Sequence, residues 1–483
     1  MNSSSCAVAT AALCAVLPGA LAAGCATARP YSAPAGQAPA AWSAASTAGA
    51  ANADGGTLAR WWTAFDDPRL TSLVERAVGG SPDVRTAVSR VREARASLAS
   101  TRSARLPTAD GSGSGRWSGG DRFAQSYGLS LDASWEPDLF GGTRSAIDAS
   151  AATADARVLD LHDVLVSLTA EVAIDYIEVR AAQRRLELAR SNLTLQDETL
   201  ELTRLRAQAG LATEIDVQQA LANAETTRSQ IAQLVSQAQR AQHALAVLIG
   251  QPPAALDGEL ADAAAIPSAP LTIAIGVPAD TLRRRPDVRS AERQLAAQFA
   301  QVSAARADLY PSFRLTGSIG LEALSLARVL LPGAAFWSSG VSASSRLFNR
   351  EQLRQNVVIQ TERQEQAMTT YETRVLAALR DVEDALTSLT QEQVRRDHLV
   401  AASAAAEQAA DLSLQLYRSG LRDFRDVLDN QRSLVTLQDS LASSTASVSE
   451  DLVRLYKALG GGWQAAAGLP ADVTAIPSPL TRR

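Results

Sequence analysis

The sequence predicts a mainly α-helical protein with a β-barrel portion, built from two copies of a unit that holds a short helix, a strand pair and two long helices. Three observations support this prediction: an internal duplication, a sustained seven-residue repeat of apolar residues, and short segments in which apolar and polar residues alternate. The chain has 483 residues, of which 46% are hydrophobic, so it can bury a sizeable core and wholesale disorder is excluded. Its formal net charge of −5 argues against a nucleic-acid-binding protein, which usually has a clustered basic face.

The duplication is visible as short matches at a nearly constant spacing. Residues 81–87 (SPDVRTA) recur as residues 285–291 (RPDVRSA). The further matches, whose spacing drifts slowly, are Arg102 with Arg306, Pro107 with Pro311, Leu139-Phe140 with Leu347-Phe348, Gly210-Leu211 with Gly420-Leu421, and Asp216-Val217 with Asp426-Val427. Chance would not keep this order. The chain therefore divides into a first repeat at residues 59–250, a connecting equatorial segment at 251–280, a second repeat at 281–460 and a C-terminal tail at 461–483.

Each repeat is predicted to contain two very long helices. In the first repeat, residues 146–209 carry an apolar residue at every seventh position over several turns, which predicts helices packed side by side. Gly210 ends this helix, and a second helix is expected over residues 214–249. The second repeat is expected to form helices over residues 349–419 and 425–459. Helices on the order of 95 Å long cannot fit in a compact globule, so they must build a rod, a tube or a stalk.

Four short segments are predicted to be β-strands, in pairs at about residues 108–136 and 311–348. In residues 127–135 the odd positions are Tyr, Leu, Leu, Ala and Trp, and the even positions are Gly, Ser, Asp and Ser, which indicates one apolar and one polar face. A soluble sandwich, with its apolar face turned inward, would show the same alternation. Segments of about nine to eleven residues also suit tilted membrane-spanning strands. One chain has too few strands to close a barrel and lipid excludes open sheet edges, so in that case three chains would supply twelve strands around a water-filled pore.

The chain's three cysteines are Cys6, Cys14 and Cys25, so no disulfide framework is available to the body of the protein. The apolar stretch before Cys25 has the length of a signal peptide and ends in Leu-Ala-Ala-Gly-Cys, which resembles a bacterial lipoprotein signal. We therefore expect residues 1–24 to be a lipoprotein signal peptide, Cys25 to receive the lipid, and residues 25–58 to be a flexible tether. The alternative is an ordinary cleaved signal peptide with an incidental cysteine.

Several motifs resemble those of one family, in the same order along the chain. They are residues 61–70 (WWTAFDDPRL), 134–141 (SWEPDLFG), 248–253 (LIGQPP), 282–288 (LRRRPDV), 427–432 (VLDNQR) and 459–463 (LGGGW). Together they make the chain similar to the TolC-like outer membrane channel proteins, and in particular to their lipidated, NodT-type branch. The resemblance implies a homotrimer, lipid-anchored in the outer membrane, with a twelve-stranded transmembrane β-barrel on an α-helical barrel that crosses the periplasm.

The resemblance also implies the function of an outer membrane channel in a tripartite efflux system. Such a channel is a passive conduit for small amphiphilic compounds and drugs, and it works with a periplasmic adaptor protein and an inner-membrane drug transporter of RND type. The sequence shows no Ser/His/Asp set, no phosphate-binding glycine loop and no metal-ligand spacing. We therefore expect no enzymatic activity, no metal, no nucleic-acid partner and no cofactor beyond a covalent lipid on Cys25.

Two other functions compete with the channel. A periplasmic hydrolase using Asp423, Asp426 and Asp429 is disfavoured, because exposed carboxylates without a hydrophobic cradle lack the environment that makes a carboxyl a general acid. A structural coiled-coil stalk or adaptor without a pore remains the alternative function. It would explain the seven-residue repeat but not the alternating strands.

Candidate functional residues cluster after the glycine that separates the last two helices. Asp426 and Asp429 are three residues apart at the start of a helix and share a face. In an isolated helix they would only favour the helix dipole, whereas threefold symmetry would turn them into charged rings around an opening. By resemblance, both residues match the acidic periplasmic aperture. Arg425 immediately precedes Asp426 and could pair with Asp429 at i+4, which would weaken the charge of the ring.

By resemblance, three further residues match a hydrogen-bonded latch that holds the channel closed: Tyr417 and Arg422 of the second repeat and Asp216 of the first. The turns at Gly210-Leu211 and Gly420-Leu421 match the tips that contact the adaptor. Opening would be an iris-like rearrangement driven by the binding of a partner.

Overall fold

The computed structural model describes residues 31–32, 39, 41–43, 58–119, 124–270, 278–464, 469 and 471–474. The chain divides into two compact units, each assembled from several stretches. Met1–Ala35, Arg90–Arg157 and Ser290–Thr373 form the sheet unit, and Gly36–Ser89, Val158–Arg289 and Arg374–Arg483 form the helical unit. Among the helices that can be described, none combines the length and the hydropathy needed to cross a lipid bilayer. The predicted signal peptide and its lipidation site, Cys25, lie outside the described residues.

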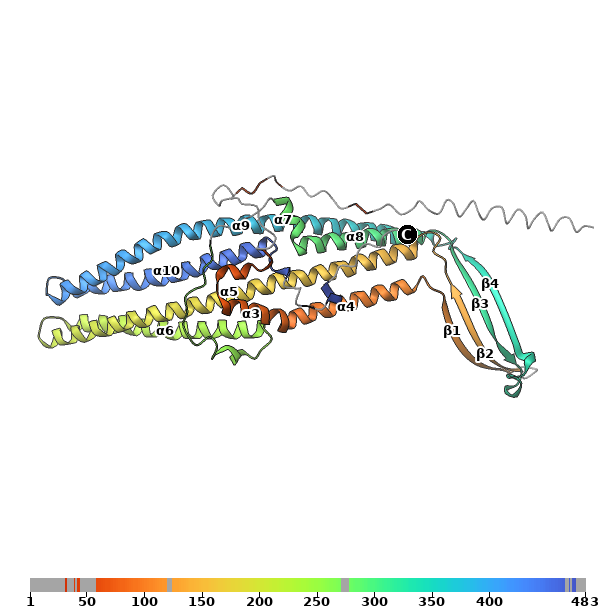
Figure 1. The fold of residues 1–483 in the computed structure, drawn as a ribbon, viewed down its shortest axis with the longest axis horizontal. Helices are drawn as coiled ribbons and strands as arrows, with labels where there is room; N and C mark the ends of the chain where they lie inside the picture. The colour runs from red at the N-terminus through yellow and green to blue at the C-terminus, as the bar shows by residue number, and fades with distance from the viewer. Residues whose placement is uncertain are drawn as a thin grey trace, which may run out of the picture. The chain divides into compact units, whose positions relative to one another are not determined.

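The sheet unit holds one antiparallel sheet of four strands. They are β1 (Thr108–Ser118), β2 (Ala124–Trp135), β3 (Ser312–Ala323) and β4 (Ala335–Ser344), in the order β1-β2-β3-β4 (Figure 1). Both predicted strand pairs are confirmed, including the glycine-rich β1, which pairs with β2 along its whole length. Because β2 also pairs with β3, the sheet joins the strands of the two repeats. Within the described residues, β1 and β4 are edge strands with one free side each.

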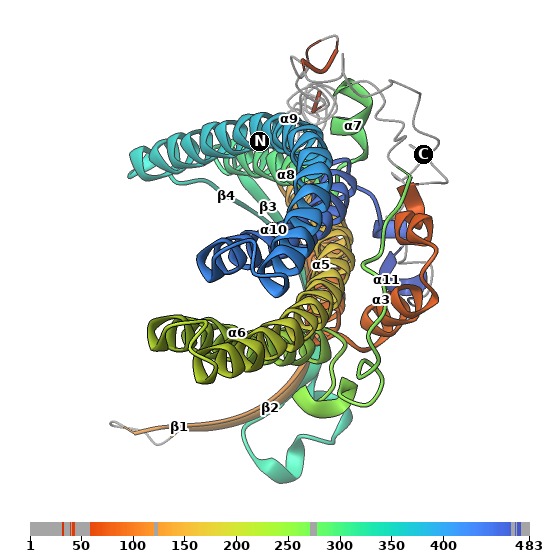
Figure 2. The ribbon, with the colours of Figure 1, turned by 90° about the vertical axis from the view of Figure 1, so that its left-hand side faces the viewer.

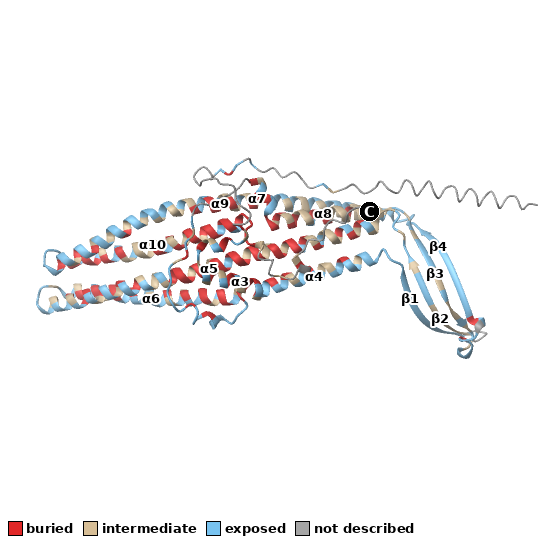
Figure 3. Cartoon of the chain, in the orientation of Figure 1, coloured by how far each residue is buried: buried red, intermediate tan, exposed pale blue. Residues whose placement is uncertain are grey.

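The two faces of the sheet differ in polarity. The strand register places Leu131, Ile319 and Trp337 side by side on one face, which we call the apolar row. These residues are 49%, 59% and 78% exposed. Asp132 and Ser318, one position along each strand, are paired on the opposite, polar face. A soluble sandwich would cover the apolar row, whereas the strands are exposed along much of their length (Figure 3).

Four long helices match the predicted ones. They are α5 (Gly142–Gln208) and α6 (Glu214–Leu248) in the first repeat, and α9 (Arg350–Arg418) and α10 (Phe424–Ala458) in the second. The shorter helices are α3 (Pro68–Gly80), α4 (Pro82–Ser103), α7 (Pro278–Arg284) and α8 (Pro286–Ala307). α5 begins at Gly142 rather than at residue 146, because the Asp138 carboxylate accepts a hydrogen bond from the backbone N–H of Arg144 at 2.7 Å and caps the first turn.

The motif at residues 61–70 packs into the core of the helical unit. The buried Trp61 ring stacks on the ring of Tyr456 in α10, with their centroids 5.4 Å apart. Asp67 caps α3 by accepting hydrogen bonds from two backbone N–H groups of its first turn. The other carboxylate oxygen of Asp67 accepts from the hydroxyl of Tyr176, in α5, at 2.8 Å. This motif therefore joins α3, α5 and α10 and has a structural role.

The connecting segment after α6 is also bound to α5. Arg180 is fully buried, and its Nη1 donates to the carbonyl oxygen of Asp262 at 2.7 Å. The side-chain amide of Gln183 donates to the carbonyl oxygen of Leu260 at 2.6 Å. Two side chains one helical turn apart thus satisfy backbone groups that regular secondary structure leaves unpaired.

Arg285 binds three elements of the helical unit. Its side chain is 10% exposed, and its Nε and Nη2 donate to the Asp287 carboxylate, at the start of α8, at 3.0 and 2.8 Å. Nη2 also donates to Asp381 in α9 at 3.1 Å, and Nη1 donates to the carbonyl oxygen of Ala458, at the end of α10, at 3.0 Å. The first repeat has Ser81 at the matching position. The second repeat therefore ties its helices together with a buried cation.

Asp163, in α5, makes the stability of the helical unit dependent on pH. Burial raises the pKa of this carboxyl to about 6, the charge of Asp287 adds to the rise, and Arg285 partly opposes it. The folded pKa lies above the unfolded value of about 3.9, so the folded state holds the proton more tightly and loses stability as the pH rises between the two values. We therefore expect Asp163→Asn to stabilise the protein by about 1–2 kcal/mol near pH 8 and to have little effect near pH 4.

Thermal unfolding of the detergent-solubilised protein at both pH values measures this effect. Asp384→Asn, at an exposed position in α9, is the control and should change the melting temperature at neither pH. A stabilisation by Asp163→Asn of the same size at both pH values would contradict the argument.

Candidate functional site

The predicted tip residues lie in two matching turns of the helical unit, one between α5 and α6 and one between α9 and α10 (Figures 1 and 2). Gly210 and Gly420 have φ angles of +74° and +78°, in the left-handed region that glycine adopts readily. In each turn the N–H of the next residue, Leu211 or Leu421, donates to the carbonyl oxygen five residues earlier, at 2.7 and 2.9 Å. Both turns are thus Schellman motifs, and each leaves an exposed leucine beyond its glycine.

The two helices that follow these turns begin differently. At the start of α6, Thr213 Oγ1 accepts from the N–H of Asp216 at 3.3 Å, and the Asp216 carboxylate accepts from the N–H of Thr213 at 2.8 Å, which is a capping box. The matching residues of α10 are Asp423 and Asp426, and Asp423 makes no side-chain capping hydrogen bond. The Asp426 carboxylate accepts instead from Arg422 Nη1 at 3.0 Å. The second repeat has therefore exchanged a backbone cap for an exposed ion pair.

The predicted aperture residues lie in the first turns of α10. Asp426 is half-buried, and Asp429 and Arg425 are exposed. The pair that Arg425 could form with Asp429 is not present, and the ion pair in this part of the described chain joins Arg422 to Asp426. Both pairs have i,i+4 spacing, and the structure uses the one whose arginine lies in the turn, outside the helix. Arg425 and Asp429 therefore remain two separate exposed charges.

The three residues predicted to form the latch do not contact one another within the described part of the chain. Asp216 takes part in the capping box, Arg422 pairs with Asp426, and Tyr417 is buried at the end of α9. A latch between protomers would need a second chain, so this role stays a prediction for the assembled protein.

Tyr417 is held by Arg206, which no motif in the sequence marks. The guanidinium carbon of Arg206, in α5, lies 4.4 Å from the centroid of the Tyr417 ring, and Nη1 donates a hydrogen bond to the Tyr417 carbonyl oxygen. Thr203 Oγ1 lies 3.4 Å from the Tyr417 hydroxyl oxygen. Because this carbonyl belongs to the last turn of α9, the cation also meets the negative end of the helix dipole. Arg206 thus joins the first helix pair to the second at the tips.

The duplication is the signal that could have pointed to Arg206. The second repeat has Leu416 at the matching place, four residues before the glycine of its turn. A cation in one repeat and an apolar residue in the other mark a position where the two helix pairs have different roles.

Farther from the tips, polar side chains join α5 to α10. The side-chain bonds run from Gln431 to Thr199 at 2.9 Å, from Asn192 to Gln438 at 2.8 Å, and from Arg185 to Asp439 at 2.6 and 3.0 Å. Beside them lies a cluster of buried residues from all four long helices: Leu200, Val217, Ala220, Tyr417, Phe424, Val427 and Leu428. The helix pairs are therefore packed together by apolar contacts and aligned by polar ones.

Comparison with known proteins identifies close relatives of this chain. Residues 73–251 and 277–461 match the Outer membrane efflux protein family. The pyoverdine export outer membrane protein OpmQ of Pseudomonas putida is 35% identical over 423 residues, which are 84% of this chain and 88% of that protein. Nodulation protein T of Rhizobium leguminosarum bv. trifolii is 32% identical over 422 residues, which are 86% of this chain and 90% of that protein. The solved structure of the outer-membrane channel OprN has a TM-score of 0.86 at 34% identity and covers 91% of this chain and 100% of its own.

Proposed function

The chain belongs to the outer membrane efflux protein family, and we propose that three copies of it form one continuous channel from the periplasm across the outer membrane. The resemblance to TolC-like channels and to NodT-type proteins is confirmed by the relatives and by the structural match. As an efflux protein of this family, the chain lies in the outer membrane and extends into the periplasm.

The observation that carries the proposal is the exposed apolar row on a sheet that, among the described strands, has two free edges. Exposed apolar side chains favour lipid over water, and lipid excludes a sheet whose edges are unpaired. Pairing β4 of one chain with β1 of the next would remove the free edges and close a barrel of twelve strands from three chains. The polar face, which includes Asp132 and Ser318, would then line a wet lumen.

The long helices support the proposal of an α-helical barrel in the periplasm. With threefold symmetry, Asp426 and Asp429 would form rings of carboxylates at the aperture, where like charges concentrate the field. Leu211 and Leu421 are exposed apolar side chains at the tips, which suits a contact with a periplasmic adaptor protein. An inner-membrane transporter of RND type is the proposed source of the cargo.

The cargo proposed for this chain is a small amphiphilic compound, chosen by the transporter rather than by the channel. One relative is named for pyoverdine export, and one solved relative is described as an outer-membrane channel. We propose a passive conduit that needs no cofactor, metal or chemistry of its own. A lipid on Cys25, outside the described residues, is the proposed anchor in the outer membrane.

Planar-bilayer recording of the purified protein tests this function. We expect discrete channels of low conductance, because the tips are held together by Arg206 and the apolar cluster. Arg206→Leu introduces the residue that the second repeat has at this place and removes a contact of about 1–2 kcal/mol, so it should raise the open population about fivefold to thirtyfold. Arg204→Leu is the matched control, because Arg204 is exposed in the same helix and pairs with Glu201 at 3.8 Å within that helix.

The outcomes separate the alternatives. If none of the three proteins conducts, the channel is contradicted and a coiled-coil stalk or adaptor without a pore is favoured. If the parent conducts and Arg206→Leu behaves like Arg204→Leu, the channel stands and the Arg206 contact does not hold it closed.

A further inference from the structure

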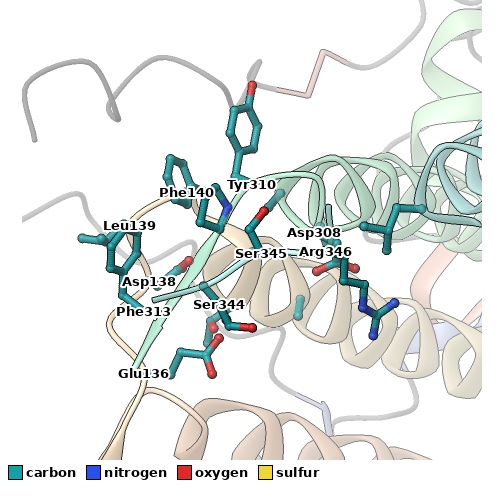
Figure 4. A pocket seen from close by; sticks show the side chains of 18 of the residues that line it. Glu136, Asp138, Leu139, Phe140, Asp308, Tyr310, Phe313, Ser344, Ser345 and Arg346 are labelled. Carbon is teal, nitrogen blue, oxygen red and sulfur yellow. The ribbon is translucent and has the colours of Figure 1, made fainter. Parts of the chain in front are cut away.

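In the sheet unit, an aromatic stack covers the joint between the two repeats. Phe140 lies between β2 and α5, and Tyr310 lies between α8 and β3. Their rings stack with centroids 4.8 Å apart and an interplanar angle of 13°. Both residues line a cavity of about 840 Å³ at this joint (Figure 4). An ion pair between Arg314 and Glu136 at 3.3 Å crosses the same joint. The end of the first strand pair is thereby bound to the start of the second.

The duplication repeats this arrangement of residues at a second place. In the duplication, Phe140 of the first repeat matches Phe348 of the second, and Tyr310 of the second repeat matches Leu106 of the first. The backbone agrees at both places. The residue after each phenylalanine has a positive φ, of +79° in the first repeat and +62° in the second. The N–H groups of Tyr310 and Leu106 each donate to the carbonyl oxygen three residues earlier, at 3.0 and 2.9 Å. Phe348 and Leu106 therefore start from the same local backbone as the stacked pair.

Within one chain, Leu106 and Phe348 flank opposite edges of the sheet. Leu106 precedes β1 and Phe348 follows β4, and the other two strands lie between them. Leu106 is 66% exposed, Leu347 is 77% exposed and Phe348 is 91% exposed. By contrast, Leu139, which matches Leu347 in the first repeat, is 36% exposed. The second repeat thus presents an apolar pair that is more exposed than its counterpart in the first repeat, which the same chain partly covers.

We propose that Leu347 and Phe348 of one chain pack against Leu106 of a neighbouring copy of the chain, as Phe140 packs against Tyr310 within the chain. The proposal rests on the channel assembly above, because it needs β4 of one chain beside β1 of the next. The contact is head-to-tail: each copy contributes Phe348 at one edge and Leu106 at the other. A threefold rotation repeats such a contact and closes the ring, so the same contact then occurs at every junction between chains.

Cross-linking between two differently tagged chains tests this contact. One chain carries Leu106→Cys, the other carries Phe348→Cys, and the two are co-expressed. The unsubstituted chain has no cysteine after Cys25, and it measures the background of cross-linking at other sites. A short bis-maleimide reagent should shift the chains to the mass of a covalent pair that carries both tags. Leu347→Cys replaces Phe348→Cys as a second reporter if the first variant fails to assemble.

The stacked pair within the chain supplies a matched control. Phe140→Cys and Tyr310→Cys, placed together in one chain, should cross-link without joining two chains. If the protein is trimeric and this control reacts while Leu106→Cys and Phe348→Cys do not, the proposed contact is overturned and the channel assembly stands. Cross-links between two chains that both carry Phe348→Cys would also overturn it, because they require a symmetric contact. A monomeric protein without cross-links between chains would overturn the assembly as well.

Discussion

Replacing Arg285 with alanine is expected to lower the free energy of unfolding of the helical unit by about 3–5 kcal/mol. The change breaks a buried ion pair and leaves the carboxylates that Arg285 paired with uncompensated. Asp287 and Asp381 lose the cation they share, and the Ala458 carbonyl oxygen loses a donor. Burial opposes the charged form of Asp287, yet the bonds and the charge of Arg285 hold the pKa of this carboxyl below its ordinary value. In the variant the burial is opposed only by the Val288 N–H and the charge of Arg374, so the pKa of Asp287 should rise.

Denaturant unfolding of the solubilised protein measures this loss. Arg283→Ala is the matched control: Arg283 is two residues away, its side chain is 80% exposed, and its ion pair with Asp280 at 3.4 Å lies within α7. The control should change the free energy of unfolding by less than about 1 kcal/mol. Equal losses in the two variants would mean that Arg285 does not tie the second repeat together.

Ile319→Arg is expected to remove most of the protein from the outer membrane, whereas Ser318→Arg, one residue earlier in β3, should leave it there. Ile319 belongs to the apolar row and Ser318 to the opposite, polar face. An arginine on the lipid face of a barrel costs about 2–4 kcal/mol near the bilayer midplane, and a trimer would carry it at three sites. On the lumen side, the same arginine stays in water.

The amount of each variant in separated outer membranes, relative to the unsubstituted protein, measures the difference. Because the two positions are adjacent in one strand, a general effect of arginine on strand formation would affect both. Normal amounts of both variants in the outer membrane would show that the apolar row does not face lipid.

Periodicity and glycine signals predicted most of the fold. The turns at Gly210 and Gly420 placed the ends of α5 and α9 within about two residues, because a left-handed glycine ends a helix locally. The alternation is weak in β1, because its glycines contribute neither a polar nor an apolar side chain. The start of α5 was predicted too late because its cap, Asp138, lies before the helix and outside its period.

The functional residues were predicted less completely, for three physical reasons. The contact between Arg206 and Tyr417 depends on which faces of α5 and α9 meet, and no pattern within either helix encodes that. The pairs Arg422–Asp426 and Arg425–Asp429 have the same spacing, so spacing cannot choose between them. The predicted latch of Asp216, Tyr417 and Arg422 would need a neighbouring chain. By contrast, the turns and the acidic helix start are local features, and the sequence located them.

The unequal starts of α6 and α10 have a consequence for symmetry. α6 keeps the reciprocal bonds of Thr213 and Asp216, while Asp423 of α10 makes no side-chain capping bond. In the proposed ring of three chains, hairpins with a capped second helix and hairpins without this cap would alternate. Six identical halves could not alternate in this way, because a substitution that loosened one hairpin would loosen every hairpin. Because one gene encodes both repeats in tandem, a substitution can change the hairpin of one repeat alone. One repeat can then stay fixed while the hairpin of the other moves when the channel opens.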